Sequence, residues 1–246
     1  MFTRVSIAIA FVTLTAISQI PQRTLRPADE AIQQSVVRTE PSYQVSIGAY
    51  LAAKVGINTT VARGRKTDIN FNTLPDFGVS IFAPFQTGSR IGAGLDLGYA
   101  TYTYVNKPES NVTDDNTIIE RYSYLNLFPH LNLSGVIVGV NLGFSPKGRA
   151  ETRSGRQVSV VTNGKTELSS DELGTLVEAR IGGNFSIWEN PIGHLNLYVM
   201  AGYVVSGLYT DYQTYIYSRD NYADNNPKPA SLALGLAYYF RVPQVK

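Results

Sequence analysis

The chain has 246 residues, a formal net charge of +2 at pH 7 and no cysteine. Its 43% hydrophobic and 16% charged residues exclude a disordered protein, and the lack of cysteine excludes disulfides, thiolate metal sites and lipid-anchored cysteines. The 21 glycines and 16 tyrosines favour strands, because glycine destabilises helices and tyrosine fits a pleated surface. The net charge by itself decides nothing about nucleic acid, and no nucleic-acid partner is expected.

The first residues predict a cleaved secretory signal. Arg4 precedes an apolar stretch that is shorter than the ~20 residues of a membrane-spanning helix, which argues against an uncleaved anchor. Ala16 and Ser18 are small residues suited to cleavage after position 18. We therefore expect a signal peptide over residues 1–18 and a periplasmic leader over residues 19–42.

The next segment alternates strictly between two kinds of residue. From Tyr43 to Ile57, every second residue is apolar or aromatic, and the residues between them are mostly small or polar. Successive side chains of a strand point to opposite faces, so this pattern predicts a strand with one continuous apolar face. At about twice the usual strand length, it is typical of a transmembrane β-barrel.

The same pattern recurs along the chain. Ser134-Gly135 between two such segments is a two-residue turn of the kind found in β-hairpins. The first, third, fifth and seventh connections are long and the others are short, which matches the extracellular loops and periplasmic turns of outer-membrane barrels. The eight predicted strands cover residues 43–57, 74–85, 90–104, 120–133, 136–144, 173–188, 194–209 and 230–241.

The predicted fold is therefore an all-β, eight-stranded antiparallel up-and-down transmembrane β-barrel over residues 43–242, with a periplasmic tail over 243–246. A secreted barrel with an inward apolar face is the alternative. The second face is rich in Gly, Ala, Ser and Asn rather than Lys and Glu, which suits the narrow lumen of eight strands. Aromatic residues near the strand ends match interfacial girdles.

Two segments carry a resemblance to a known family. Tyr124-Leu-Asn-Leu-Phe-Pro129 and Leu234-Gly-Leu-Ala-Tyr-Tyr-Phe240, with the Gly-rich hairpins, resemble small outer-membrane β-barrel proteins of Bacteroidetes and related bacteria, which include PorT-like and OmpA/OmpX-like barrels. The resemblance implies an outer-membrane location and insertion by the barrel-assembly machinery, and the order of long and short connections places both termini in the periplasm. In that family the last strand usually ends the chain on an aromatic residue, whereas here Phe240 is followed by residues 241–246.

The phase of the alternation places five charged residues on the inner face. Charges in a closed lumen persist only when paired, so we expect a salt-bridge network. In it Lys54 and Asp76 lie at similar heights, and Arg180 is shared between Asp96 and Glu178. The network is expected to be a static core, and a rearranging, ion-admitting lumen is the alternative. The five residues are Lys54, Asp76, Asp96, Glu178 and Arg180.

The long connections supply candidate contact residues. A basic first loop would suit the phosphates of lipopolysaccharide, and a tyrosine-rich fourth loop would suit a binding surface. A merely solvated loop and an extension of the seventh strand are the respective alternatives. The residues are Arg63, Arg65, Lys66, Tyr212, Tyr215, Tyr217 and Tyr222.

No catalytic or metal site is predicted, and no cofactor is expected. His130 and His194, the two histidines, fall near the periplasmic ends of their strands, whereas several outer-membrane enzymes place a catalytic histidine in the outer half. Asp114-Asp115 in the second loop has no histidine beside it and fits a solvated acidic loop.

We therefore expect a monomeric, non-enzymatic outer-membrane barrel in contact with outer-membrane lipid, with a structural or interaction role for its extracellular loops. Three alternatives remain open at this stage. They are a narrow channel for ions or small solutes, a lipid-modifying enzyme, and a secretion accessory of the PorT-like kind.

Overall fold

The structure is a computed structural model. It describes residues 45–62, 64–86, 89–218 and 226–242. The described residues all belong to one compact unit. The predicted signal peptide, leader and C-terminal tail lie outside the described residues. Within the described stretches, no helix is long and apolar enough to cross a membrane.

Strands dominate the described part of the chain, and two 3-10 turns accompany them. The elements are β1 Ser46–Asn58, β2 Arg65–Phe71, β3 Asp76–Pro84, β4 Ile91–Pro108, β5 Ile118–Leu133, β6 Val136–Thr152, β7 Gln157–Val158, β8 Glu167–Leu168, β9 Leu176–Asn190, β10 Gly193–Val204, η1 Tyr212–Thr214, η2 Ile216–Ser218 and β11 Pro229–Arg241.

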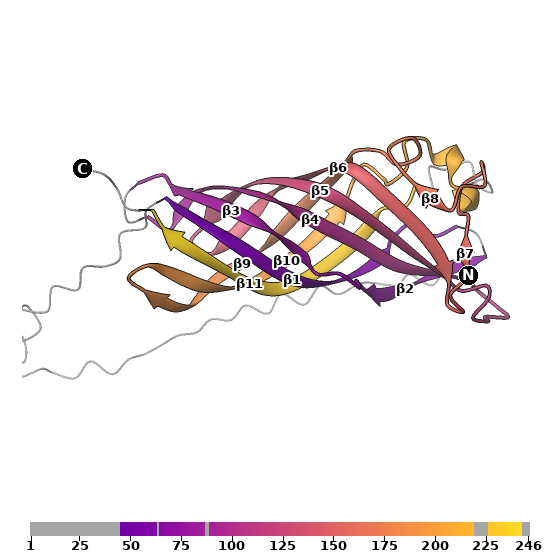
Figure 1. The fold of residues 1–246 in the computed structure, drawn as a ribbon, viewed down its shortest axis with the longest axis horizontal. Coiled ribbons are helices and arrows are strands. Elements are labelled where there is room, and N and C mark those ends of the chain that lie inside the picture. The colour runs from indigo at the N-terminus through magenta and orange to yellow at the C-terminus, as the bar shows by residue number, and fades with distance from the viewer. Residues whose placement is uncertain (1–44, 63, 87–88, 219–225, 243–246) are drawn as a thin grey trace, which may run out of the picture. The chain divides into compact units, whose positions relative to one another are not determined.

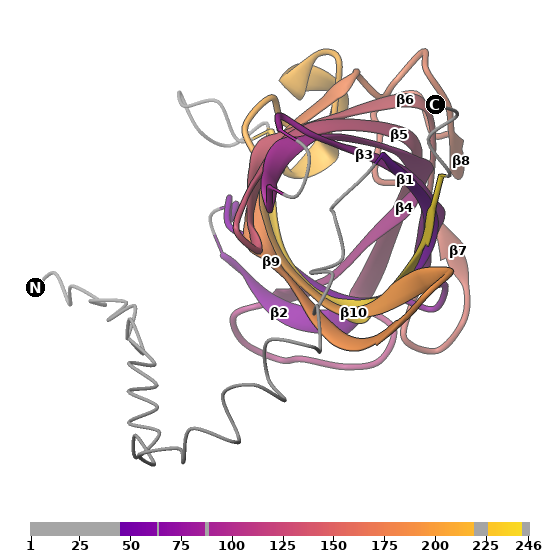
Figure 2. The ribbon, with the colours of Figure 1, turned by 90° about the vertical axis from the view of Figure 1, so that its left-hand side faces the viewer.

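Eight of these strands form a closed ring in the order β1-β3-β4-β5-β6-β9-β10-β11 (Figures 1 and 2). Each neighbouring pair is antiparallel, and β11 closes the ring by pairing with β1 from Ser46↔Arg241 to Asn58↔Pro229. Closure leaves no free edge among these eight strands, so their backbone groups are paired around the ring. The predicted eight-stranded antiparallel up-and-down barrel is confirmed.

The two faces of the wall differ as the alternation predicted. On β1, Ile47 and Leu51 are 47% and 56% exposed, whereas Lys54 and Asn58 on the opposite face are buried. Large exposed apolar side chains recur on every strand of the ring and form an apolar belt. From Ile47 to Ile57, ten steps of ~3.3 Å on a strand tilted by ~40° span about 25 Å along the barrel axis.

The end of the barrel with the long connections is more structured than predicted. β2 lies within the predicted first loop, where Val55 of β1 pairs with Phe71 and residues 65–69 pair with β4. β4 to β6 continue beyond the belt, and β7 and β8 pair with the extended β6. The sequence predicted loops there instead, because these segments are polar and rich in charge.

The two kinds of connection are built differently. The β5–β6 hairpin turns through Ser134 and Gly135, which both have positive φ as a two-residue turn requires. At the other end, β10 stops at Val204 rather than continuing to position 209 as predicted. Gly207, at φ +79°, redirects the chain there, and Leu208 and Tyr209 are then buried.

Candidate functional site

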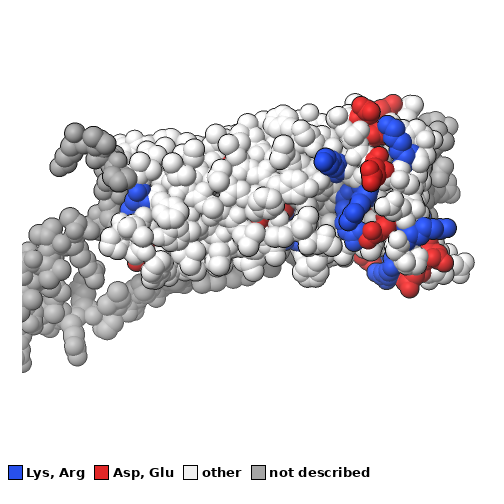
Figure 3. Space-filling model, viewed as in Figure 1, with Lys and Arg blue, Asp and Glu red and all other residues white. Residues whose placement is uncertain are grey.

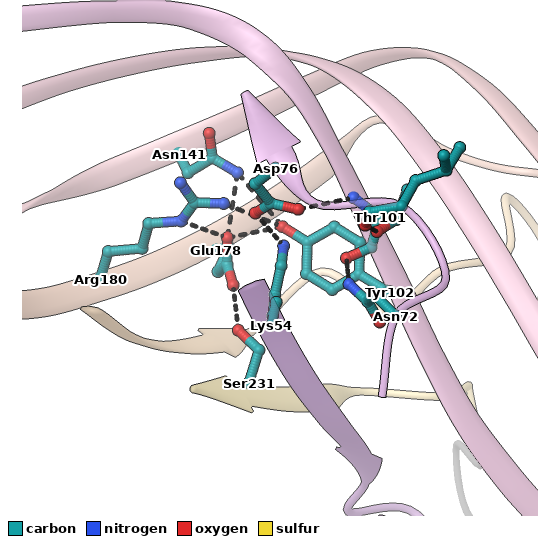
Figure 4. A network of polar contacts seen from close by, with 10 residues as sticks. Lys54, Asn72, Asp76, Thr101, Tyr102, Asn141, Glu178, Arg180 and Ser231 are labelled. Atoms are coloured by element: carbon teal, nitrogen blue, oxygen red, sulfur yellow. Dashed lines mark hydrogen bonds and ion pairs between the residues drawn. The ribbon is translucent and has the colours of Figure 1, made fainter. Parts of the chain in front are cut away.

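Polar side chains meet in the middle of the barrel in what we call the central network (Figure 4). All its members project from the inner faces of ring strands, and each is at most 8% exposed. Its charged members are two cations and two carboxylates, which balance in number. The central network comprises Lys54, Asp76, Tyr102, Glu178 and Arg180.

One half of the central network is the pair between β1 and β3. Lys54 Nζ lies 2.5 Å from Asp76 Oδ2, and the other carboxylate oxygen accepts a hydrogen bond from the Thr101 backbone N–H at 3.0 Å. The Lys54 ammonium also lies 4.0 Å from the centroid of the Tyr102 ring. These contacts hold the ammonium between a carboxylate and an aromatic face, which offsets part of its desolvation cost.

The other half centres on Glu178 of β9. Its Oε2 accepts hydrogen bonds from Arg180 Nε at 2.6 Å, Tyr102 Oη at 2.7 Å and Asn141 Nδ2 at 3.0 Å. Ser231 Oγ donates to Oε1 at 3.1 Å. A Cβ at Gly202 would collide with this carboxylate, so glycine is needed there for Glu178 to fit. These four donors, one of which is the Arg180 guanidinium, engage both carboxylate oxygens of Glu178.

Asp96 lies apart from Arg180, contrary to the shared arrangement expected from the sequence. Its Oδ1 accepts a hydrogen bond from Ser80 Oγ at 2.5 Å and lies 3.9 Å from His130 Nδ1. Among the described residues, no ion pair joins Asp96 to Arg180. Arg180 instead extends toward Glu178 on its own strand and toward Tyr102, because its Nη2 donates to the Tyr102 hydroxyl at 3.1 Å.

The lumen is open at the short-turn end and filled at its centre. A cavity of about 310 Å³ at the short-turn end is lined by polar groups that include His130, His194 and three asparagines. A cavity of about 10 Å³ lies beside the central network. That volume is close to the smallest that can hold one water molecule. The side chains of the central network therefore fill most of the space around this cavity.

Tyrosines fill the long-loop end of the lumen around one carboxylate. Glu120 is 0% exposed and accepts hydrogen bonds from three hydroxyls, those of Tyr122 at 2.5 Å, Tyr215 at 2.8 Å and Tyr104 at 3.0 Å. Tyr209 Oη lies 2.8 Å from that of Tyr122. We call Tyr104, Glu120, Tyr122, Tyr209 and Tyr215 the tyrosine cluster.

The loop between β10 and β11 completes the tyrosine cluster. Asn226 Oδ1 accepts from the backbone N–H groups of Leu208 and Tyr209, both at 2.9 Å, and its Nδ2 donates to the Tyr209 carbonyl at 2.7 Å. This amide fixes the inward course of the chain after Gly207. Tyr215 follows η1 and is 2% exposed, so it supplies packing inside the barrel rather than contact area on the loop surface.

The other predicted loop residues are likewise either turned toward the barrel or exposed on the loop surface. Arg65 lies 4.2 Å from the Tyr217 ring centroid and donates to Asn106, so it is turned toward the barrel mouth. Lys66 and Tyr212 are exposed. Arg63 and Tyr222 lie outside the described residues. Lys66 and Tyr212 therefore remain available as surface contacts within the described part of these loops.

Sequence reasoning missed the tyrosine cluster. Glu120 and Tyr122 lie on the inner face of β5 by the same alternation that identified Glu178, so their phase was a usable signal. They were passed over because residue 120 stood at the predicted start of the strand. The contribution of Tyr215 had no such signal, because it depends on how a long loop folds.

The groups considered for catalysis lie far from this arrangement or have other partners. His194 stacks on Tyr239 at 5.2 Å between ring centroids, and His130 faces Asp96. Asp115 accepts a hydrogen bond from Ser154 at 2.7 Å. Within the described residues, no group of three or more His, Asp or Glu side chains is arranged to hold a metal ion.

Comparisons with known proteins add the following. No protein-family model matches the sequence, and no curated protein matches it. Among solved structures, the barrel is similar to Ail, the attachment invasion locus protein of Yersinia pestis, solved with the heparin analogue sucrose octasulfate. That match has 14% identity and a TM-score of 0.37, and it covers 80% of this chain and all of Ail.

Two further solved structures are similar to the chain. One is the outer membrane protein OprG of Pseudomonas aeruginosa, at 10% identity and a TM-score of 0.36, covering 82% of this chain and 99% of OprG. The other is the outer membrane protease OmpT of Escherichia coli, at 12% identity and a TM-score of 0.30. That match covers 80% of this chain and 95% of OmpT. At these identities and scores, the likenesses carry no inference about what this chain does.

Proposed function

We propose that this chain is a bacterial outer-membrane β-barrel with a closed lumen, whose role is structural or interactional and is carried by its long-loop end. The apolar belt supports the membrane location. Soluble monomers rarely expose contiguous apolar patches larger than a few hundred Å², whereas here exposed side chains such as Leu51, Ile181 and Leu234 recur around the whole ring. A height of about 25 Å matches the apolar band of outer-membrane barrels.

The orientation follows the usual asymmetry of such barrels, with short turns in the periplasm and long loops outside. Both ends of the barrel segment, the start of β1 and the end of β11, lie at the short-turn end and would face the periplasm. Charged side chains gather at the opposite end, over the long connections, while the middle of the visible face carries few (Figure 3). Proteolysis of intact cells, with cleavage mapped to residues 153–156, tests this orientation.

The observation that carries the proposal of a closed barrel is the filled centre. Two buried ion pairs and the Tyr102 ring occupy the lumen, and the adjoining cavity of about 10 Å³ is too small for a file of water molecules. Above them the tyrosine cluster adds a second layer. This arrangement supports a static core over the alternative of a narrow channel.

Single-channel recording tests the proposal. The barrel, folded from the mature chain in planar lipid bilayers, is expected to give no steady openings. A variant with all four charged side chains of the central network changed to alanine is expected to conduct, because it removes the ion pairs that fill the lumen. A matched control, Lys165→Ala with Glu172→Ala, removes an ion pair between the β7–β8 and β8–β9 connections and is expected to stay silent.

Steady wild-type openings whose conductance changes in Arg180→Ala would make the chain a channel and overturn the closed lumen. Heat-modifiable migration of each variant on a gel shows that the barrel has folded before it is recorded. The role we propose is non-catalytic, and loss of a lipid-modifying activity on changing a particular Ser, Asp or Tyr of the long-loop end would contradict it. The PorT-like resemblance adds a secretion role, which deletion of the gene and assay of secreted proteins would test.

A further inference from the structure

The outer wall of β5 and β6 carries a group of basic residues just beyond the apolar belt. Arg121 of β5 lies directly opposite Arg149 of β6, and Ser123 lies opposite Lys147. Opposed residues on adjacent strands have Cβ atoms about 5 Å apart, and like charges placed so are destabilising without a counter-charge. The belt begins one step further along, where Leu125 lies opposite Phe144 and both are exposed.

The chain itself supplies only part of the counter-charge. Arg121 forms an ion pair with Glu151. Lys147 and Arg149 are exposed, and neither forms an ion pair with another described residue. Glu167 of β8 lies opposite Arg149 in the sheet but forms no ion pair with it. Three cationic groups thus face two carboxylates, which leaves an excess of positive charge on this part of the wall.

These basic residues line a groove. It has a volume of about 620 Å³ and runs across the outer face from β4 to β8, with Arg121, Lys147 and Arg149 among its lining residues. Tyr99 and the 54% exposed Leu74 line it as well, and Tyr99 stacks on Phe77 at 5.7 Å between ring centroids. One side of the groove therefore carries three cations and the single carboxylate of Glu167, and the other side carries Tyr99 and Leu74 next to the belt.

We infer that this groove binds a phosphorylated glycolipid of the outer leaflet, with the phosphate on Lys147, Arg149 and Arg121 and the acyl chains along the belt beside Leu125. Lysine and arginine side chains make strong charge-assisted hydrogen bonds to phosphate oxygens. A lipid satisfies both halves of the groove at once, because its charged and apolar parts meet at the level where the belt ends. A soluble phosphate compound or an acidic peptide would leave the apolar half exposed to lipid.

The inference deepens the proposed function and rests on it, because it requires this end of the barrel to face the outer leaflet. The first loop, where the sequence suggested lipopolysaccharide contacts, is a weaker candidate. Arg65 is turned inward onto Tyr217, and Lys107 beside β2 is paired with Asp68. Among the residues that line the groove, the cations without an ion pair are Lys147 and Arg149, both on β6.

The test measures lipid retained by the folded barrel. The mature chain is folded into vesicles in which about one tenth of the lipid is lipid A and the rest is phosphatidylcholine. The barrel is then extracted in mild detergent and examined by native mass spectrometry. The wild type is expected to retain bis-phosphorylated lipid A at least about tenfold better than lipid A without phosphate. Lys147→Gln with Arg149→Gln is expected to lose this preference. Arg153→Gln, an exposed cation four residues further along, is the matched control and is expected to behave as the wild type.

Three results would overturn the inference: equal retention of both lipids by the wild type, unchanged retention by the double variant, and full displacement of the lipid by an equimolar concentration of inorganic phosphate. Failure of the proposed function looks different, because the chain would then not insert into vesicles or show heat-modifiable migration. A barrel that inserts and folds but shows no preference for phosphorylated lipid contradicts the groove alone.

Discussion

The central network and the tyrosine cluster each bury a carboxylate completely, but they satisfy it in different ways. Glu178 has the Arg180 guanidinium against it, with the Lys54–Asp76 pair nearby. Glu120 is surrounded by neutral donors, three tyrosine hydroxyls and the Asn106 amide. In the central network a cation neutralises the Glu178 carboxylate, whereas in the tyrosine cluster only neutral hydrogen-bond donors stabilise the Glu120 carboxylate.

The central network and the tyrosine cluster also differ in which elements of the fold supply their members. Every member of the central network lies on a ring strand, so the register of the barrel sets its geometry. The tyrosine cluster includes Tyr215 from the β10–β11 loop, so it is complete only when that loop is folded. Damage to the central network should therefore weaken the barrel as a whole, whereas damage to the tyrosine cluster should release the loop.

The largest effect is expected from Glu178→Gln. The amide keeps the shape of the side chain but leaves Arg180 buried without a carboxylate, and breaking a buried pair in this way costs about 3–5 kcal/mol. Urea unfolding of the barrel in vesicles, followed by fluorescence of Trp188, the one tryptophan of the chain, should show a lower midpoint. Glu167→Gln, an exposed residue of β8, is the control. An unchanged midpoint for Glu178→Gln would mean that the pair does not hold the lumen together.

A smaller effect is expected from Glu120→Gln. The amide oxygen can still accept from the tyrosine hydroxyls, and only one acceptor is replaced by a donor, so the cost should be about 1–2 kcal/mol. Limited proteolysis should show faster cleavage between Val205 and Lys228, while the urea midpoint changes less than in Glu178→Gln. If Glu120→Gln were the more damaging of the two, the distinction between the clusters would be wrong.

The smallest effect is expected from acid, at an ion pair outside both clusters. Burial favours a higher pKa for Glu172, but hydrogen bonds from Lys165, Ser169 and Asn163 outweigh it and hold the pKa below its ordinary value. A lowered carboxyl pKa stabilises the folded loop above the ordinary value of 4.5, and this contribution is lost as the pH falls through the lowered pKa.

The hydrogen-exchange protection factors of residues 163–173, which correct for the pH dependence of the intrinsic exchange rates, should therefore fall below about pH 4.5, while the central network, built from strand residues, keeps its protection. In Glu172→Gln the protection factors of this loop should no longer depend on pH in that range. Wild-type protection factors as independent of pH as those of the variant would show that Glu172 does not stabilise the loop.

The sequence alone determined the barrel, its strand number and which side chains face inward. This was possible because strand alternation is a local property: once Lys54 and Glu178 stood opposite the apolar positions, their inward direction followed from the pleat. It also placed Lys54 and Asp76 at similar heights, where the structure has them 2.5 Å apart.

Only the tertiary structure decided which inward charges meet and how the long-loop end is filled. The stagger between strands sets Arg180 against Glu178 and leaves Asp96 beside Ser80, and no local pattern encodes that stagger. The inward course of Tyr215 depends on Gly207 and on Asn226, which is 17 residues from its backbone partner Tyr209. The paired extension of β5 and β6 past the belt, which brings Arg121, Lys147 and Arg149 to one groove, likewise arises from long-range pairing that residue order does not reveal.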